Sequence, residues 1–364
     1  MKILHLSTEP SWRGGERQIL FLHQELLAKG IDSSIACREN SPVHDFCIEN
    51  KLPFIAWPFR SAYDLITAHK IKSFCRENSI HILHMHTAKG HTLGVMAGLM
   101  GLKITMVLSR RVDFSVKHNW LSRFKYNYPA IKKIICVSDK IREIMRPDLV
   151  NPSVLTVVHS GIDLRPFENK KKNTYLKEKY KLPGGTILIG NTSALADHKD
   201  YFTFIDTAKA LTKTRKGVKF FIIGEGPLEK EIRAYIKDNQ LENDIIMTGF
   251  ITEIPYILKS LDVFLFTSKT EGLGTSVLDA LAAGLPVVAT RAGGVKEIIS
   301  HQENGYLCET GDIQSLAESV SDLIENPGKA QKFINKGYET VKKFSKAATA
   351  QKTLEIYQQL LDTK

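Results

Sequence analysis

The sequence predicts two α/β domains, each built on a doubly wound parallel sheet. Short apolar, β-branched segments alternate with longer helix-patterned segments through both halves of the chain, which is typical of parallel strands joined by helical crossovers. The chain has 364 residues, 43% of them hydrophobic, which is enough for two cores because a domain usually contains roughly 100–200 residues. Ligands bind outside the carboxyl ends of the strands in such sheets, so we expect an interdomain cleft where the two sets of ends face each other.

The predicted strands follow from the positions of the apolar runs. In the first half they are 2–7, 33–37, 82–86, 104–109, 134–138 and 154–159. In the second half they are 187–191, 219–224, 245–248, 263–267 and 286–290. Residues 168–173 are polar and charged, and we expect an unpacked linker there.

The end of the chain is predicted to be a helix that returns to the first domain. Its apolar residues lie on one stripe at helical spacing, namely Ala350, Leu354, Tyr357 and Leu361. The predicted domains are therefore residues 1–167 with about 347–364, and residues 174–346.

Composition points to a cytoplasmic protein with an anionic partner. The five cysteines are scattered and form no C-x-x-C pair, which favours reduced thiols. The start of the chain reads as a strand rather than a signal peptide, and no apolar run approaches the roughly 20 residues that cross a bilayer. Residues 1–164 contain 22 Lys and Arg against 14 Asp and Glu. This excess indicates a phospholipid surface, a phosphorylated acceptor or a nucleic acid.

The segment from Glu271 to Asp279 is the most informative one for chemistry. A predicted strand leads into a glycine-containing turn, and a helix is predicted to begin near Thr275. The free N–H groups of a helix start, with the helix dipole, form a natural seat for a diphosphate, and Gly272 and Gly274 let the backbone approach closely. Glu271 is suited to accept hydrogen bonds from sugar hydroxyls and Asp279 to hold ribose hydroxyls. The alternative is an ordinary loop–helix junction with solvated acids.

This segment resembles the E-x7-E signature of the retaining family-4 glycosyltransferases (glycosyl transferases group 1). Further motifs of that family follow the expected order along nearly the whole chain: Gly14-Gly15-Glu16, Ser160-Gly161-Ile162-Asp163, Gly224-Glu225-Gly226-Pro227, Gly284-Leu285-Pro286 with the strand after it, Ala292-Gly293-Gly294 and Glu297. The resemblance implies the GT-B fold, which has two Rossmann-like domains. It places acceptor binding in the first domain and nucleotide-sugar binding in the second.

The activity that the resemblance implies is transfer of a sugar, with retention, from a nucleotide diphosphate to a glycan or lipid-linked acceptor. We expect UDP as the nucleotide, no cofactor, no nucleic-acid partner, and a place in bacterial envelope polysaccharide or lipopolysaccharide synthesis. No D-x-D sequence occurs in the chain, so the usual metal–diphosphate ligands of the other large glycosyltransferase fold are missing. We therefore expect a metal-independent reaction.

Three positions depart from the family pattern. Asp279 stands where a second glutamate is usual. Lys199 matches the family's diphosphate-binding lysine, but Asn191 occupies the approximate place of its arginine, which increases the demand on Lys199 and on backbone donors. The family histidine after a middle strand is missing, and either an arginine of the Ser109-Arg110-Arg111 run, with Arg110 the first candidate, or His86 is expected to replace it.

Several glycines are candidate ligand contacts. Gly14 and Gly15 are expected in a loop facing phosphate and sugar, and Gly224 and Gly226, like Gly272, Leu273 and Gly274, are expected to bring backbone close to the nucleotide. In each case an ordinary turn is the alternative.

A basic and aromatic segment between Asp113 and Asp139 is a candidate for contact with an anionic membrane, although its aromatic residues are equally suited to the core. It contains Lys117, Arg123, Lys125, Lys132 and Lys133 among Trp120, Leu121, Phe124, Tyr126 and Tyr128. The protein is then expected at the inner face of the membrane.

The sequence also bears on three other functions. A dehydrogenase needs a third glycine that the segment starting at Gly224 lacks. A sugar-nucleotide epimerase or hydrolase of the same fold, and a non-catalytic glycan- or nucleic-acid-binding protein, remain alternatives.

Overall fold

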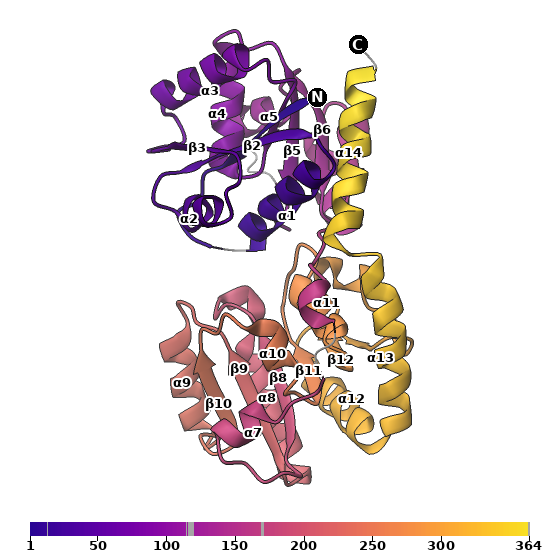
Figure 1. Cartoon of the computed structure of the whole chain (residues 1–364). Helices are drawn as coiled ribbons and strands as arrows, with labels where there is room; N and C mark the ends of the chain where they lie inside the picture. The colour runs from indigo at the N-terminus through magenta and orange to yellow at the C-terminus, as the bar shows by residue number, and fades with distance from the viewer. Residues whose placement is uncertain (13, 114, 116–119, 169–170, 363–364) are drawn as a thin grey trace. The chain divides into compact units, whose positions relative to one another are not determined.

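The computed structural model describes residues 1–12, 14–113, 115, 120–168 and 171–362. The chain divides into two compact units (Figure 1). The first consists of Met1–Gly161 with the C-terminal stretch from Lys346, and the second of Ile162–Ser345. The chain therefore passes into the second unit a few residues before the predicted end of the first domain.

The predicted linker, residues 168–173, belongs to the second unit where it is described, and its residues 169–170 lie outside the described part. The N–H of Asn173 donates to the carbonyl of Lys259 at 3.1 Å, and its Nδ2 donates to the carbonyl of Tyr256 at 2.9 Å. The expectation of an unpacked segment is wrong at Asn173, because its amide satisfies backbone carbonyls of the second unit.

A seven-stranded parallel sheet forms the first unit, with the strand order β3-β2-β1-β4-β5-β6-β7. The strands are β1 (Lys2–Ser7), β2 (Asp32–Arg38), β3 (Phe54–Trp57), β4 (Ile82–Met85), β5 (Thr105–Arg110), β6 (Ile131–Cys136) and β7 (Leu155–Val157). The helices are α1 (Gly14–Ala28), α2 (Pro42–Glu49), α3 (Leu65–Glu77), α4 (Ala88–Leu99), α5 (Trp120–Tyr126), α6 (Asp139–Met145) and α14 (Lys346–Asp362). The strand order reverses between β1 and β4, so the carboxyl ends of these two strands mark a switch point where ligands usually bind.

Helix α14 packs against α1 of the first unit (Figure 1). Its buried residues Ala350, Leu354 and Tyr357 join Leu22 and Leu26 of α1 in one core cluster. Leu361 packs at the edge of the same cluster. The predicted return of the C-terminal helix to the first domain is confirmed.

A six-stranded parallel sheet forms the second unit, with the order β10-β9-β8-β11-β12-β13. The strands are β8 (Ile187–Thr192), β9 (Val218–Ile223), β10 (Ile245–Gly249), β11 (Val263–Phe266), β12 (Val287–Thr290) and β13 (Tyr306–Cys308). The helices are α7 (Tyr175–Lys179), α8 (Tyr201–Thr214), α9 (Glu229–Asp238), α10 (Ile254–Leu258), α11 (Thr275–Ala282), α12 (Ile313–Glu325) and α13 (Pro327–Lys342). The order reverses between β8 and β11, which defines the second switch point.

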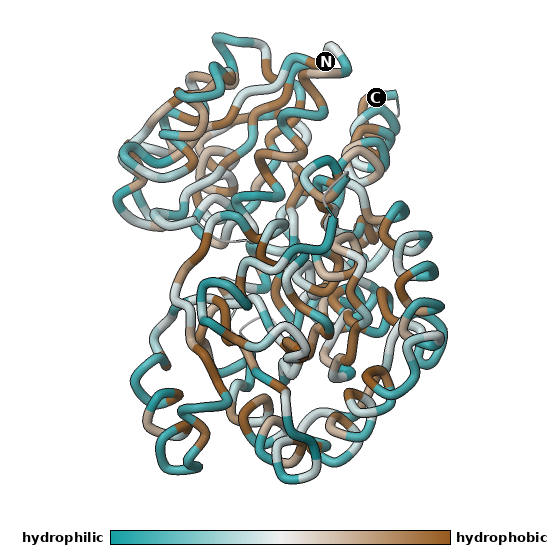
Figure 2. Tube along the Cα trace, turned by 60° about the horizontal axis from the view of Figure 1, so that its bottom comes forward, coloured by the Kyte–Doolittle hydropathy of each residue, from teal (hydrophilic) through white to brown (hydrophobic). Residues whose placement is uncertain are grey.

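Apolar residues of the strands build the core of the second unit. Ile189 of β8, Phe220 of β9 and Leu265 of β11 are fully buried in one cluster with Phe204 of α8. Figure 2 shows long apolar stretches in the interior, while outer helical turns alternate between polar and apolar residues. This is the pattern expected of helices that bury one face against a sheet.

Side-chain caps define where several helices begin. The Thr87 hydroxyl accepts the N–H of Gly90 at 3.1 Å before α4, and Asp312 accepts the N–H of Ser315 at 3.0 Å before α12. Such a cap satisfies one of the N–H groups that the first helical turn leaves without a partner.

Every one of the predicted strands coincides with an observed strand, with small shifts at the ends, whereas β3 and β13 were not predicted. Both are short and lie next to turn-forming residues that obscure the strand pattern, since Pro53 and Pro58 enclose Phe54–Trp57 and Asn304-Gly305 directly precedes Tyr306–Cys308. All five cysteines are described, and they are free and buried. Among the described residues, no helix is both long and apolar enough to cross a bilayer.

Candidate functional site

Lys199 and Glu271 form an ion pair at the switch point of the second unit. Lys199 ends a short 3-10 turn after β8, and Glu271 follows β11. Nζ of Lys199 lies 2.5 Å from Oε1 of Glu271, and the two side chains are only 15% and 11% exposed. The Ser268 hydroxyl also donates to Oε1 of Glu271 at 2.8 Å. Two residues separated by 72 positions are thus brought into direct contact.

The backbone around Lys199 is tied to the loop after β11. Asp200 adopts a left-handed conformation with φ 48° and caps α8 through the N–H of Thr203. The Thr267 hydroxyl donates to the carbonyl of Asp200 at 3.0 Å, and the N–H of Lys269 donates to the carbonyl of His198 at 2.8 Å. These hydrogen bonds fix the backbone on either side of Lys199 relative to the loop that carries Glu271.

The loop that carries Glu271 rests on Gly293 and Gly294. The N–H of Gly294 donates to the carbonyl of Glu271 at 3.2 Å. Gly293 has φ 52°, and a Cβ at this position would lie 1.9 Å from that carbonyl oxygen. Only glycine fits here, because a side chain would have to displace the backbone of Glu271.

Helix α11 begins beside this pair without a side-chain cap. Gly274, at its N-cap, has φ 93°, and no side chain accepts from the first turn in the described structure. The N–H groups of this turn are therefore suited to an anion. Leu273 is buried between Gly272 and Gly274, and Asp279 lies in the helix with a side chain that is also buried.

Gly224 and Gly226, two of the other glycines predicted to contact the nucleotide, pack against backbone of the second unit. A Cβ on Gly224 would lie 2.1 Å from the carbonyl oxygen of Ser193, and one on Gly226 would lie 2.6 Å from the backbone of Leu195. Both glycines therefore permit two loops of the second unit to pack together. Their contact with a nucleotide stays a prediction.

Asn191 is fully buried on β8. Neither its Oδ1 nor its Nδ2 has a hydrogen-bond partner within the described part of the chain. In this conformation the side chain is not accessible to a ligand, so a role in nucleotide binding also stays a prediction.

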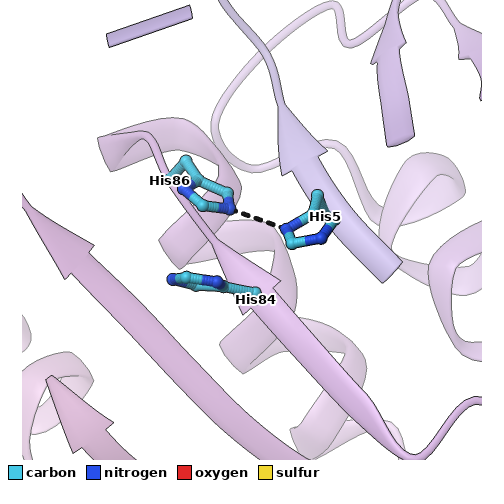
Figure 3. Close-up of side chains that lie close together, drawn as sticks. All are labelled: His5, His84 and His86. Carbon is cyan, nitrogen blue, oxygen red and sulfur yellow. Dashed lines mark hydrogen bonds between the residues drawn. The ribbon is translucent and has the colours of Figure 1, made fainter. Parts of the chain in front are cut away.

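Three buried histidines mark the switch point of the first unit (Figure 3). His5 lies on β1 opposite His84 of β4, and His86 follows β4. Nδ1 of His5 is 2.9 Å from Nε2 of His86, and the rings of His84 and His86 lie 3.8 Å apart between centroids.

Arg111 determines the tautomers of two of these rings. Its Nη2 lies 3.1 Å from Nδ1 of His86. Because arginine only donates, Nδ1 of neutral His86 accepts, and its Nε2–H therefore donates to Nδ1 of His5. The remaining proton of His5 is on Nε2, which has no partner among the described residues.

The third histidine is held by two hydroxyl groups. Nδ1 of His84 is hydrogen-bonded to the Tyr357 hydroxyl of α14, and its Nε2 lies 2.9 Å from the Ser109 hydroxyl. Burial lowers the pKa of all three histidines well below the usual value, and neighbouring histidines and Arg111 act in the same direction. The cluster is therefore uncharged at neutral pH.

This histidine cluster does not fit a metal ion. The three rings are close enough to share one. However, both nitrogens of His84 and both nitrogens of His86 already have partners, and the Arg111 cation lies beside them. A divalent ion would have to replace these bonds and stand next to a positive charge.

The two adjacent arginines point to different partners. Nη1 of Arg110 donates to the Tyr126 hydroxyl at 2.9 Å, whereas Arg111 contacts His86. Gly15 lies beside Arg111, since a Cβ there would be 3.8 Å from Cδ of Arg111, while Gly14 has open space around it. The structure thus brings His86 together with Arg111 rather than with Arg110.

Sequence reasoning missed His5, His84 and Tyr357 as members of this cluster. The alternation of His84 and His86 in a buried strand was a usable signal, because both side chains then lie on one face of the sheet. The contact of Tyr357 spans 273 positions and has no local signal.

Two Rossmann-like parallel sheets, with charged or polar groups at both switch points, form the architecture of the GT-B glycosyltransferases. Similarity to solved structures agrees. Anabaena Alr3699/HepE in complex with UDP has a TM-score of 0.87 and 19% identity, with 99% of this chain and 100% of that chain covered. A glycosyltransferase from Rickettsia africae ESF-5 has a TM-score of 0.86 and 19% identity, with both chains covered completely.

Family comparisons cover nearly the whole sequence. Residues 172–340 match the family model described as Glycosyl transferases group 1, and residues 12–165 match Glycosyltransferase Family 4. The UDP-Gal:alpha-D-GlcNAc-diphosphoundecaprenol alpha-1,3-galactosyltransferase of Escherichia coli is 25% identical, with 88% of this chain and 87% of the relative covered. An N-acetylgalactosaminyltransferase of Campylobacter jejuni, which acts on a diphospho-undecaprenol-linked sugar by its name, is 24% identical, with 84% and 80% covered. The chain belongs to the group 1 glycosyltransferases.

Substitution of Gly293 tests how the Glu271 loop is held. Gly293→Ala and Gly311→Ala both place a side chain at positive φ, but only the first meets Glu271, since nothing lies within 4 Å of a Cβ on Gly311. We expect Gly293→Ala to lower the free energy of unfolding by about 1–3 kcal/mol more than Gly311→Ala. Urea titrations followed by circular dichroism measure this, and equal losses would contradict the proposed support.

The buried histidines predict that the first unit loses stability in mild acid. Burial lowers the pKa of His23 to about 4 and that of His91 to about 3. Between these values and about 6.5 the unfolded state binds more protons, so stability falls as pH falls, by up to about 1.4 kcal/mol per pH unit for each such histidine.

Tryptophan fluorescence reports this unit alone, because all three tryptophans, Trp12, Trp57 and Trp120, lie in it. We expect His23→Gln to reduce the slope of unfolding free energy between about pH 5 and 6.5. His69→Gln, at an exposed position, is the control and should leave the slope unchanged. A wild-type slope of zero would refute the prediction.

Proposed function

We propose that this glycosyltransferase moves a sugar from a nucleotide diphosphate, with UDP as the nucleotide, to a glycan or lipid-linked acceptor, with retention and without a metal or cofactor. The observation that carries the proposal is the Lys199–Glu271 pair beside the uncapped start of α11. Structures of Anabaena HepE with UDP and with UDP-glucose, and the UDP-Gal named for the E. coli relative, support the choice of donor.

In the proposed reaction, Lys199 and the N–H groups near Thr275 stabilise the charge that develops on the leaving diphosphate. Glu271 accepts hydrogen bonds from the sugar, and Asp279 holds the ribose. Before the donor binds, Lys199 is paired with the carboxylate of Glu271. Binding of the donor then gives Lys199 the diphosphate as its anionic partner in place of this carboxylate. This exchange limits the cost of desolvating the lysine.

The first unit is proposed to bind the acceptor, and its excess of basic residues suits an anionic group. Of the residues predicted to act in the first unit, His86 is better placed to hold Arg111 than to take a proton, because both of its ring nitrogens have partners. Arg110 is proposed to orient Tyr126. Gly14 and Gly15 remain candidates for contact with phosphate or sugar.

We propose a cytoplasmic enzyme that associates with the inner face of the membrane during envelope polysaccharide synthesis. The E. coli and C. jejuni relatives act on diphosphoundecaprenol-linked acceptors by their names. On α5, Trp120 is 78% exposed and Phe124 is 43% exposed, next to the basic Arg123. Tyr126 of the same segment instead packs on Arg110 and His91. Lys117 lies outside the described residues. No nucleic-acid partner is proposed.

A non-catalytic glycan-binding protein or a sugar-nucleotide epimerase or hydrolase of the same fold is the second candidate. It is favoured by Asn191, a buried amide where the family places an arginine. Product analysis with and without acceptor separates these functions.

Lys199→Ala and Glu271→Ala should each reduce sugar transfer by at least about tenfold, because each removes a charge that contacts the donor. Transfer is measured as acceptor-dependent release of UDP from UDP-sugars, after a thermal-shift screen of UDP-, GDP-, ADP- and CDP-sugars. Lys269→Ala is the matched control, since this neighbouring lysine is 43% exposed and pairs with Asp197. Full activity in both site variants, with unchanged melting temperatures, would place the site elsewhere.

Flotation with liposomes tests the membrane proposal. We expect recovery with anionic vesicles to exceed that with neutral vesicles, and Trp120→Ala to lower it, because an exposed indole anchors at the interface. Tyr63→Ala, which changes an aromatic residue of similar exposure on the same unit, is the control. Equal recovery from both kinds of vesicle would end the proposal.

A further inference from the structure

We propose that Arg111, held by His86, forms a phosphate-binding subsite in the first unit. The inference rests on the proposed function, since it names a chemical group that the glycosyl-transfer substrates supply. It concerns the switch point between β1 and β4, and its residues are separate from the Lys199–Glu271 pair.

The contacts of Arg111 leave part of its guanidinium for a ligand. Nη2 donates to Nδ1 of His86 at 3.1 Å, while Nε is buried and has no partner within the described residues. The residue as a whole is only partly buried. Its Cδ lies close to Gly15, where the missing side chain leaves room beside the arginine.

The charge of Arg111 is poorly compensated by the described residues. A buried guanidinium is usually paired with a carboxylate, but the hydrogen-bond partner here is a neutral imidazole. Burial lowers the pKa of Arg111 to about 10, while the charges of Glu16 and Tyr357 act in the opposite direction. Arg111 is thus a cation at neutral pH, and an incoming anion would supply the missing hydrogen bonds and charge.

The histidines hold this cation without neutralising it. Because His86 donates from Nε2 to His5, its Nδ1 can only accept, and it orients Nη2 of Arg111. A carboxylate in the place of His86 would form an ion pair with the guanidinium and compete with an anionic ligand. The neutral ring leaves the arginine available for the bidentate geometry that phosphate oxygens favour.

Phosphate oxygens occur in two substrates of the proposed reaction, the donor diphosphate and a phosphate-bearing acceptor. Calorimetric titrations with UDP and with decyl phosphate below its micelle concentration distinguish these sources. We expect Arg111→Gln to weaken binding of at least one probe by tenfold or more, because a charge-assisted hydrogen bond is lost. Loss with UDP assigns the subsite to the donor, and loss with decyl phosphate assigns it to the acceptor.

Arg142→Gln is the matched control, since this arginine of the same unit is half exposed and pairs with Asp139. Wild-type affinities of Arg111→Gln for both probes would overturn the inference. If Arg111→Gln does not fold, Arg111→Lys replaces it, because lysine keeps the charge but not the planar fork. An unchanged affinity of that variant for both probes would equally overturn it.

The same titrations separate this inference from the proposed function. If Lys199→Ala abolishes transfer while Arg111→Gln binds both probes normally, only the subsite is wrong. If no nucleotide sugar binds but decyl phosphate binding still depends on Arg111, the proposed function is wrong and the subsite stands.

Discussion

The ion pair between Lys199 and Glu271 is the interaction on which the second unit's site depends. It joins the loops after β8 and β11, the two strands between which the sheet order reverses. A largely buried pair is costly to desolvate and is weak evidence for stability by itself. We propose that its position beside an uncapped helix start accounts for that cost, because the proposed function places the donor diphosphate beside the same lysine.

The two units place different chemistry at equivalent points of similar sheets. In the second unit the switch point carries a charged pair, whereas in the first it carries neutral histidines and one cation, Arg111. Helix α14 contributes to the first site through Tyr357, which holds His84. The C-terminal helix therefore does more than cover a core, since it completes the polar network at that switch point.

The fold was largely predictable because apolar periodicity is a local property of the chain. Strands such as β1 and β8 carry enough apolar positions to be recognised, whereas turn-forming residues obscure β3, which Pro53 and Pro58 enclose, and β13, which follows Asn304-Gly305. The site was only partly predictable. The Glu271–Asp279 motif predicted Glu271, and the family resemblance predicted Lys199, but their contact, like that of His84 with Tyr357, depends on tertiary packing. The choice between Arg110 and Arg111 likewise requires knowing which side of β5 each side chain occupies.

A crystal structure with bound UDP tests the central claim most directly. The account predicts that diphosphate oxygens lie within hydrogen-bonding distance of Nζ of Lys199 and of the backbone N–H groups at Thr275. UDP bound in another place, with the Lys199–Glu271 pair intact and the start of α11 untouched, would contradict it.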